Sequence, residues 1–206
     1  MSRTWVLVLS AALAMGSLPR QLAAETIPVG GTATQFETDI ETRVGGQPVK
    51  MVLTGAGLRI RGLPPLVSVK VYALGSYVEA GKGIRTLEDL LSVQAAKQLH
   101  LVMERNVEGH EMADSFRNAL RVNHPSPRFD RQLDHLCAIM RTLRIQKGDH
   151  VMMTHVPGKG LVVDLVGKRE FLVEDVQFSR AIWEMFLGRN PLDETLKKNL
   201  VARLSL

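Results

Sequence analysis

Cysteine is nearly absent from this chain, since Cys137 is the single one among its 206 residues. One thiol excludes an intramolecular disulfide framework and any zinc finger built on cysteines. Aromatic residues are also scarce, at 5%, and none interrupts the basic stretch of Arg141, Arg144 and Lys147. Nucleic-acid platforms combine cations with stacking aromatics, and a net charge of +5 is modest. We therefore expect no nucleic-acid partner.

Long hydrophobic runs are missing too, apart from one near the N-terminus. Trp5–Met15 is uncharged, follows Arg3 and is shorter than the ~20 residues of a spanning helix. The run Leu22-Ala23-Ala24 then offers small residues before Glu25, which is the layout of a secretory signal peptide. We expect residues 1–24 to be removed and the rest to be exported to the periplasm or the medium, with no integral membrane segment. An uncleaved N-terminal anchor is the alternative.

What the chain does contain is the composition of an ordinary folded domain. Apolar residues make up 45% and charged residues 23%, which is too apolar for a disordered chain. Seventeen glycines and nine prolines fit normal turns. We find no internal repeat and no linker. The expected organisation is a polar lead-in at 25–46, with room for one strand, followed by one domain at 47–206.

Hydrophobic periodicity predicts strands in the first half of the chain and helices mainly later. The strands are expected at 49–78, at 97–105 and in a hairpin at 148–165. The helices are expected at 86–94 with Thr86 as N-cap, at 108–122, 129–143 and 176–187, and from Pro191 onward. This order predicts an α+β fold, in which a largely antiparallel sheet is covered on one face by a helical layer.

Common metal-binding and phosphate-binding motifs are incomplete. His110-Glu111 begins a zinc-protease motif, but position 114 holds Asp where the second histidine would stand. Gly158-Lys159-Gly160 lacks the other residues of a phosphate loop and fits a hairpin turn. The six histidines are scattered along the chain. We therefore expect neither a metal nor a cofactor.

Two arginines and a tyrosine on neighbouring predicted strands are the candidate site. Arg59 and Arg61 lie on one strand, and Tyr72 follows Arg59 by thirteen residues. In an antiparallel pair a guanidinium and a phenol can point the same way, and in an apolar cavity they would grip a carboxylate. The alternative is that they are surface polar residues. Because a one-residue shift reverses the faces of a strand, the sequence leaves open whether Arg59 or Arg61 faces the cleft.

Four segments resemble the chalcone-isomerase-like family, most closely its bacterial exported branch. They are Leu53–Arg59, Lys70–Glu79, Val156–Leu161 and Phe186–Lys197. The resemblance covers residues 47–206. It implies an open-faced β-sandwich of chalcone-isomerase type, in which helices cover one face of a large antiparallel sheet and a ligand cleft lies between the two layers.

The resemblance implies roles for individual residues, because two activities are known for this fold. Plant enzymes cyclise chalcones and hold the phenolate with an arginine, whereas non-catalytic members hold a fatty-acid carboxylate with an arginine and a tyrosine. Arg59 falls on the arginine position of both groups. Tyr72 falls on the binders' tyrosine, where the enzymes carry threonine. Asn118 matches an active-site asparagine and Ser179 a hydroxyl near the last helices. No tyrosine follows Tyr77, so the enzymes' tyrosine near the start of the 108–122 helix is missing.

Three functions stay open at this point. The favoured one is binding of a fatty-acid-like amphiphile whose carboxylate is held by Arg59 and Tyr72. The second is an intramolecular lyase or isomerase acting on an enone or phenolic substrate, with Arg59 stabilising the anion and Tyr72 as acid. The third is a non-catalytic envelope interaction protein with a collapsed cleft, in which Arg59 pairs with an internal carboxylate such as Glu79 or Glu104. In the first, the tail is expected to contact Val71, Leu101, Met103, Met112 and Phe116.

Overall fold

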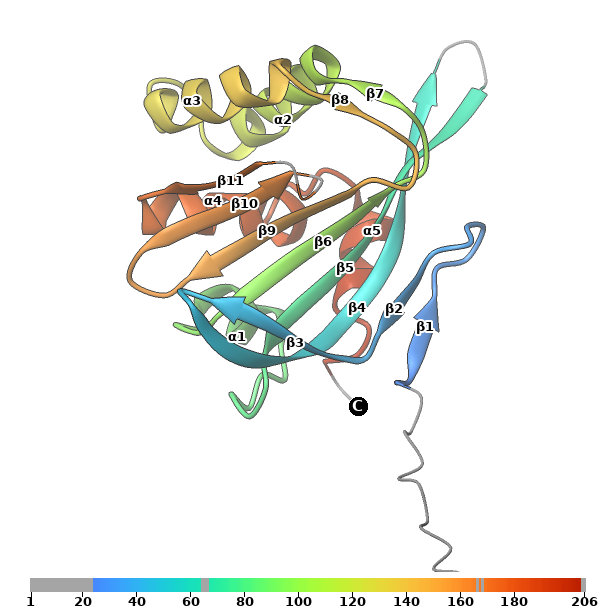
Figure 1. Ribbon diagram of the computed structural model, residues 1–206, viewed down its shortest axis with the longest axis vertical. Coiled ribbons are helices and arrows are strands. Elements are labelled where there is room, and N and C mark those ends of the chain that lie inside the picture. Colours follow the sequence, from blue (N-terminus) through green and yellow to red (C-terminus); the bar gives the residue numbers. More distant parts are fainter. Residues whose placement is uncertain (1–23, 64–66, 166, 168, 205–206) are drawn as a thin grey trace, which may run out of the picture.

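A single seven-stranded antiparallel sheet organises the computed structural model, which describes residues 24–63, 67–165, 167 and 169–204 (Figure 1). Its order is β11-β10-β9-β6-β5-β4-β3. The strands are β3 (Asp39–Val44), β4 (Gln47–Leu63), β5 (Val67–Glu79), β6 (Lys97–Met103), β9 (His150–Val156), β10 (Gly160–Leu165) and β11 (Arg169–Val173). Each neighbouring pair is antiparallel, as the sequence predicted.

Five helices and two small ribbons complete the described part of the chain. The helices are α1 (Leu87–Ser92), α2 (Gly109–Asn123), α3 (Asp130–Arg141), α4 (Val176–Leu187) and α5 (Glu194–Leu200). The ribbons pair β1 (Thr26–Pro28) with β2 (Gln35–Glu37), and β7 (Val107–Glu108) with β8 (Arg144–Ile145). None of these helices is long and apolar enough to cross a membrane. The predicted signal peptide, except Ala24, lies outside the described residues.

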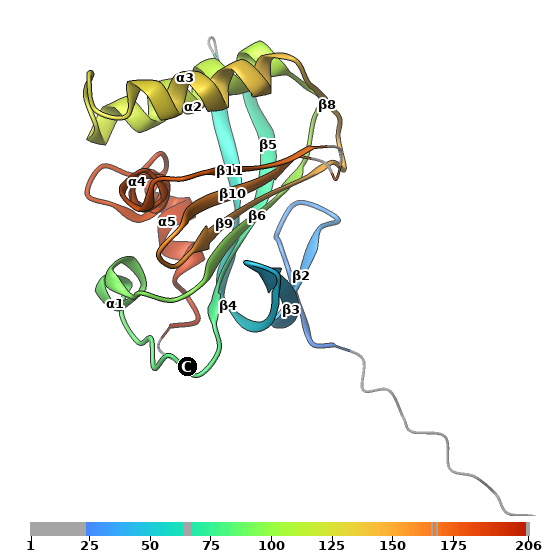
Figure 2. The same ribbon diagram turned by 60° about the vertical axis from the view of Figure 1, so that its left-hand side comes forward.

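The helices lie on one face of the curled sheet, and the main hydrophobic core is buried between these layers (Figure 2). This confirms the predicted α+β architecture with a helical layer. A second, smaller core lies on the opposite face, where Phe36 of β2 packs with Met51, Ala73 and Tyr77. The β1–β2 ribbon therefore covers part of the face that was expected to be open.

The N-terminal segment is more structured than its sequence indicated. Residues 25–46, expected as a loose lead-in with room for one strand, contain three strands. One of them, β3, pairs with β4 from Asp39 to Val44 and forms an edge of the main sheet. Its residues alternate between exposed and half-buried, and only the last, Val44, is buried. That pattern is weak in the sequence because an edge strand buries little apolar surface.

Local signals placed the helices well. Thr86 caps α1 in a capping box with Asp89, as its sequence predicted. The last helix begins at Glu194, three residues after Pro191, because the carboxylate of Asp193 accepts the N–H of Leu196 and acts as N-cap. The edge strand β11 was not expected, since its short sequence begins with the charged residues Arg169 and Glu170.

Two glycines allow α5 to lie directly on β4. A Cβ at Gly55 would be 2.1 Å from the carbonyl oxygen of Asn199, and a Cβ at Gly57 would be 2.9 Å from the Asn199 Cβ. Real side chains do not fit at such distances, so glycine is required at this contact. On the same strand the hydroxyl of Thr54 donates to the carbonyl of Leu200 at 2.8 Å. The contact fixes α5 against the sheet, and the N-cap Asp193 with it.

We predict that Gly55→Ala lowers the free energy of unfolding by about 3 kcal/mol, because the added methyl group meets backbone atoms of α5. Gly62→Ala, farther along β4, is the matched control, since nothing lies within 4 Å of its Cβ position. Its effect should stay within about 0.5 kcal/mol. Urea unfolding of both variants measures the difference. Equal stabilities would contradict a tight contact between α5 and β4.

Candidate functional site

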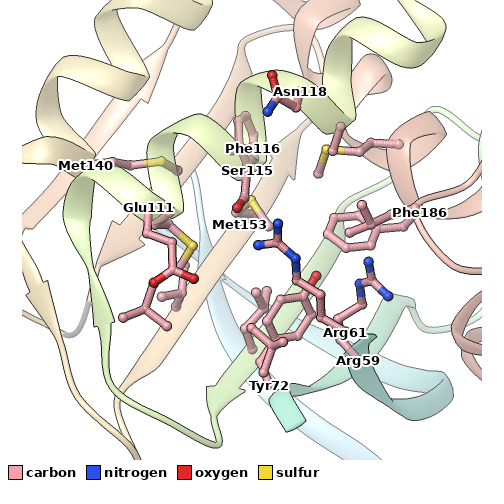
Figure 3. Close-up of a pocket in the computed structure, with 18 of the residues that line it drawn as sticks. Arg59, Arg61, Tyr72, Glu111, Ser115, Phe116, Asn118, Met140, Met153 and Phe186 are labelled. Atoms are coloured by element: carbon pink, nitrogen blue, oxygen red, sulfur yellow. The ribbon is translucent and has the colours of Figure 1, made fainter. Parts of the chain in front are cut away.

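A cavity of about 340 Å³ lies between the sheet and the helical layer, within the size range of ligand pockets (Figure 3). Its wall is mainly apolar and combines residues of β4, β5, β6, β9 and β10 with residues of α2, α3 and α4. Four methionines line it: Met112, Met140, Met153 and Met185. Because methionine is flexible and polarisable, such a wall adapts to apolar groups of different shape.

Arg59 and Tyr72 face this cavity from adjacent strands. They are direct register partners in the β4–β5 pair, so their side chains lie on the same face of the sheet. Beyond this pair the register shifts, and Ile60 pairs with Lys70, which leaves Val71 without a partner on β4. Arg61 also lines the cavity (Figure 3). The sequence left open which of the two arginines faces the cleft, and in the structure both Arg59 and Arg61 line it.

Arg59 is held by an internal carboxylate. Its Nη1 donates to Oδ2 of Asp193 at 2.9 Å, and each side chain is 18% exposed. The other carboxylate oxygen, Oδ1, accepts the N–H of Leu196 at 3.0 Å. Asp193 therefore caps α5 and neutralises Arg59 at the same time.

The internal carboxylates named from the sequence contact other groups. Glu79 forms an ion pair with Lys82 at 2.9 Å. Glu104 accepts a hydrogen bond from the hydroxyl of Thr34, also at 2.9 Å. Neither is the partner of Arg59. The third hypothesis expected an internal carboxylate to pair with Arg59, but the carboxylate is that of Asp193 and not of Glu79 or Glu104. The sequence did contain a signal for Asp193, which precedes Glu194 at the start of a helical pattern, but a cap motif says nothing about a distant arginine.

Burial keeps the phenol of Tyr72 protonated. Desolvation raises the pKa of Tyr72 far above its usual value, and the nearby Asp193 charge acts in the same direction. The charge of Arg59 lowers this pKa, but with a smaller effect. At neutral pH Tyr72 is therefore a neutral hydroxyl that can donate a hydrogen bond beside a guanidinium.

A second pair of polar residues lies on the cavity wall near the start of α2. Arg105 and Glu111 both line the cavity and form an ion pair with each other. Arg105 also donates to the carbonyl of Asn106 at 3.1 Å, while its buried Nε has no partner among the described residues. This pair was not predicted, because Arg105 lies in the loop after β6, Glu111 lies in the first turn of α2, and the two belong to no motif.

The remaining candidate residues divide between the cavity and the core. Asn118 lines the cavity from α2. Ser179 of α4 does not line the cavity. It is fully buried, and its hydroxyl lies 2.8 Å from Nδ1 of His155. Of the expected tail contacts, all but Met103 belong to the wall: Val71, Leu101, Met112 and Phe116. Met103 is buried in the main core instead.

Within the described ranges, no group of three or more His, Cys, Asp or Glu residues is arranged to hold a metal ion. His100 and His150 do lie side by side, with Nε2 and Nδ1 2.7 Å apart, but they are only two residues. The absence of a metal or cofactor stays a prediction from the sequence.

We predict that the two roles of Asp193 can be separated by substitution. Asp193→Asn keeps an oxygen that can cap α5 but removes the charge that faces Arg59, and should lower the free energy of unfolding by up to about 1 kcal/mol. Asp193→Ala removes both interactions and should cost about 2 kcal/mol. Denaturant unfolding measures both. Asp134→Ala, which breaks a more exposed pair with Arg117, is the control and should change stability little. Identical losses for Asn and Ala would contradict a role as N-cap.

Comparisons with known proteins agree with this geometry. The chalcone isomerase-like family matches residues 32–202. A crystal structure of a fatty-acid-binding protein from Arabidopsis thaliana superposes with a TM-score of 0.70 at 19% identity, and the match covers 88% of this chain and 98% of that one. A search of curated proteins finds no match. The match to the family begins at residue 32 and so includes β2 and β3. By this match over most of its length, the chain belongs to the chalcone isomerase-like family.

Proposed function

We propose that the cavity binds a fatty-acid-like amphiphile without catalysis, and that Arg59 and Tyr72 hold its carboxylate. The observation that carries this proposal is the placement of a guanidinium and a protonated phenol on one face of an apolar cavity. Such a cavity suits a long apolar tail, and the two donors suit a carboxylate. The fatty-acid-binding protein of the same fold supports the choice of ligand class.

Arg59 can bind a ligand while Asp193 holds it. A guanidinium has five N–H donors in a planar fork. Among the described residues, the two hydrogen-bond acceptors of the Arg59 guanidinium are the backbone carbonyl of Ile60 and the carboxylate of Asp193, and both contact Nη1. The edge formed by Nε and Nη2 is therefore available to a carboxylate, and the ion pair with Asp193 holds that edge in a fixed orientation. A group held in its binding geometry loses less entropy when the ligand arrives.

The charges around the cavity also suit a singly charged head. Arg59 is balanced by Asp193 and Arg105 by Glu111. Arg61 lines the same cavity and forms no ion pair with any described residue. The charged groups at the cavity therefore carry one positive charge in excess, which attracts a monoanion such as a fatty-acid carboxylate.

We predict that a medium-chain fatty acid binds with 1:1 stoichiometry. The cavity has room for roughly ten groups of water size at about 30 Å³ each, so dodecanoic acid is a suitable probe. Tyr72→Phe should weaken binding about tenfold through loss of one hydrogen bond. Arg59→Ala should weaken it about a hundredfold or more through loss of the charged partner. Native mass spectrometry of residues 25–206 and calorimetric titration measure both effects.

Two controls accompany this measurement. Arg141→Ala removes an exposed arginine that pairs with Asp114 outside the cavity, and it should leave the affinity unchanged. Dodecanol, with the same chain but no carboxylate, should bind more weakly than the acid. A wild-type protein that is empty after purification and takes up no added acid would overturn the proposal.

We also propose that the protein is exported after removal of residues 1–24. The first described strand begins at Thr26, and the carbonyl of Glu25 accepts the N–H of Thr38 at 2.8 Å. Cleavage between Ala24 and Glu25 would therefore leave the β1–β2 ribbon intact.

We predict that expression of the whole chain in a Gram-negative host yields a periplasmic protein whose N-terminal residue is Glu25, as read by N-terminal sequencing and intact mass. Ala24→Phe, which places a bulky residue at the cleavage site, should accumulate the uncleaved form. Recovery of wild-type protein from the cytosol with residues 1–24 in place would exclude export, and recovery from the membrane fraction in that form would favour an uncleaved anchor.

A further inference from the structure

The adjoining ends of strands β4 and β5 project beyond the rest of the sheet (Figure 1). On β5, strand β6 pairs with residues 72–78 and no further. Residues 60–63 of β4 and 67–70 of β5 therefore pair with each other alone. We call these two described segments the finger. Its base is adjacent to the cavity, because Arg59, Arg61 and Val71 all line the cavity wall.

Exposed apolar side chains gather at the finger and the cavity rim. Among the described residues, four large hydrophobic side chains are exposed: Ile60 at 44%, Val67 at 57%, Val122 at 61% and Leu172 at 39%. Ile60 and Val67 belong to the finger, and Val122 lines the cavity from α2. Single exposed hydrophobic residues need no explanation. Ile60 and Val67 lie on opposite faces of the hairpin, so the finger exposes apolar groups on both of its faces.

The finger itself carries only positive charge, while the acidic residues Asp193 and Glu104 lie at its base. The sequence contains no Asp or Glu from Thr42 to Val78, although this segment holds five cations: Arg43, Lys50, Arg59, Arg61 and Lys70. Two of these, Arg61 and Lys70, are in the finger itself. Lys70 donates to the backbone carbonyl of Gly31, which is uncharged. Arg61 is exposed and, in the described part of the chain, has no acidic partner.

We propose that the finger docks on a lipid bilayer with anionic headgroups. Exposed apolar side chains together with cations are the combination that binds such a surface, because the apolar groups enter the interface and the cations pair with headgroup charge. An acidic protein surface would use the cations but would leave Ile60 and Val67 without a reason for exposure. Because the base of the finger lines the cavity, docking through the finger brings the cavity next to the bilayer, where amphiphiles reside. The proposal does not require a bound ligand, so it can be tested apart from the proposed function.

A fluorescent probe on the finger tests this directly. The native Cys137 is fully buried, so an environment-sensitive fluorophore can be attached selectively to Val67→Cys in the full chain. We expect a blue shift when phosphatidylcholine vesicles containing phosphatidylglycerol are added, and little shift with phosphatidylcholine alone. Leu172→Cys, on the edge strand β11, is the matched control and should show no shift. No shift at position 67, or equal shifts at both positions, would overturn the proposal.

Charge substitutions provide an independent measurement. Arg61→Gln should weaken vesicle binding about fivefold, the effect of one cation near an anionic bilayer. Arg169→Gln removes an exposed arginine from β11 and should have no effect. Because both variants keep residues 1–23, any contribution from that segment is the same in both. Equal vesicle affinities for the two variants would count against the finger as the docking element.

The ligand and the membrane can be distinguished with a third variant. Val67→Ser removes an exposed apolar group and lies outside the cavity lining. It should weaken vesicle binding, while the affinity for dodecanoic acid in solution should match that of the wild type. If the acid does not bind but the probe still reports insertion, the proposed function fails and the docking surface stands.

Discussion

The ion pair between Arg59 and Asp193 joins the sheet to the C-terminal helix at the cavity wall. An arginine in a largely apolar wall needs a counterion, because an uncompensated buried charge is costly. Here the counterion is also the N-cap of α5, so one carboxylate satisfies a helix end and a charged side chain. This geometry depends on Gly55 and Gly57, whose missing side chains allow α5 to lie against β4.

The two layers contribute different properties to the cavity. The sheet supplies Arg59 and Tyr72, whose relative position is set by strand pairing. The helices supply three of the four methionines of the wall, Met112, Met140 and Met185, which are flexible side chains. A head group would therefore meet a rigid pair of donors, and an apolar tail would meet a surface that adapts to it.

The same hairpin carries the polar pair and the projecting finger. Arg59 and Tyr72 lie where β4 and β5 still belong to the sheet, and the finger begins one residue beyond Arg59. The register shift at this point changes which residues face the cavity, since it allows Val71 to line the wall beside Tyr72. A bulge next to a functional residue that re-aims side chains is a common feature of sheets. In the two proposals, the carboxylate clamp and the membrane contact therefore belong to one β-hairpin.

The sequence by itself determined the local structure and one half of the site. Periodicity and caps such as Thr86 identified the helices, because these signals act over a few neighbouring residues. The thirteen-residue spacing only allowed Arg59 and Tyr72 to meet in a hairpin, and the family resemblance singled them out as a pair. The β4–β5 register makes them direct partners. Only the tertiary structure decided that Asp193 holds Arg59, that Arg105 and Glu111 share the cavity, and that Ser179 is buried beside His155. Those contacts join different elements, and in the case of Arg59 and Asp193 elements 134 residues apart, so they depend on how helices pack on the sheet rather than on any local pattern.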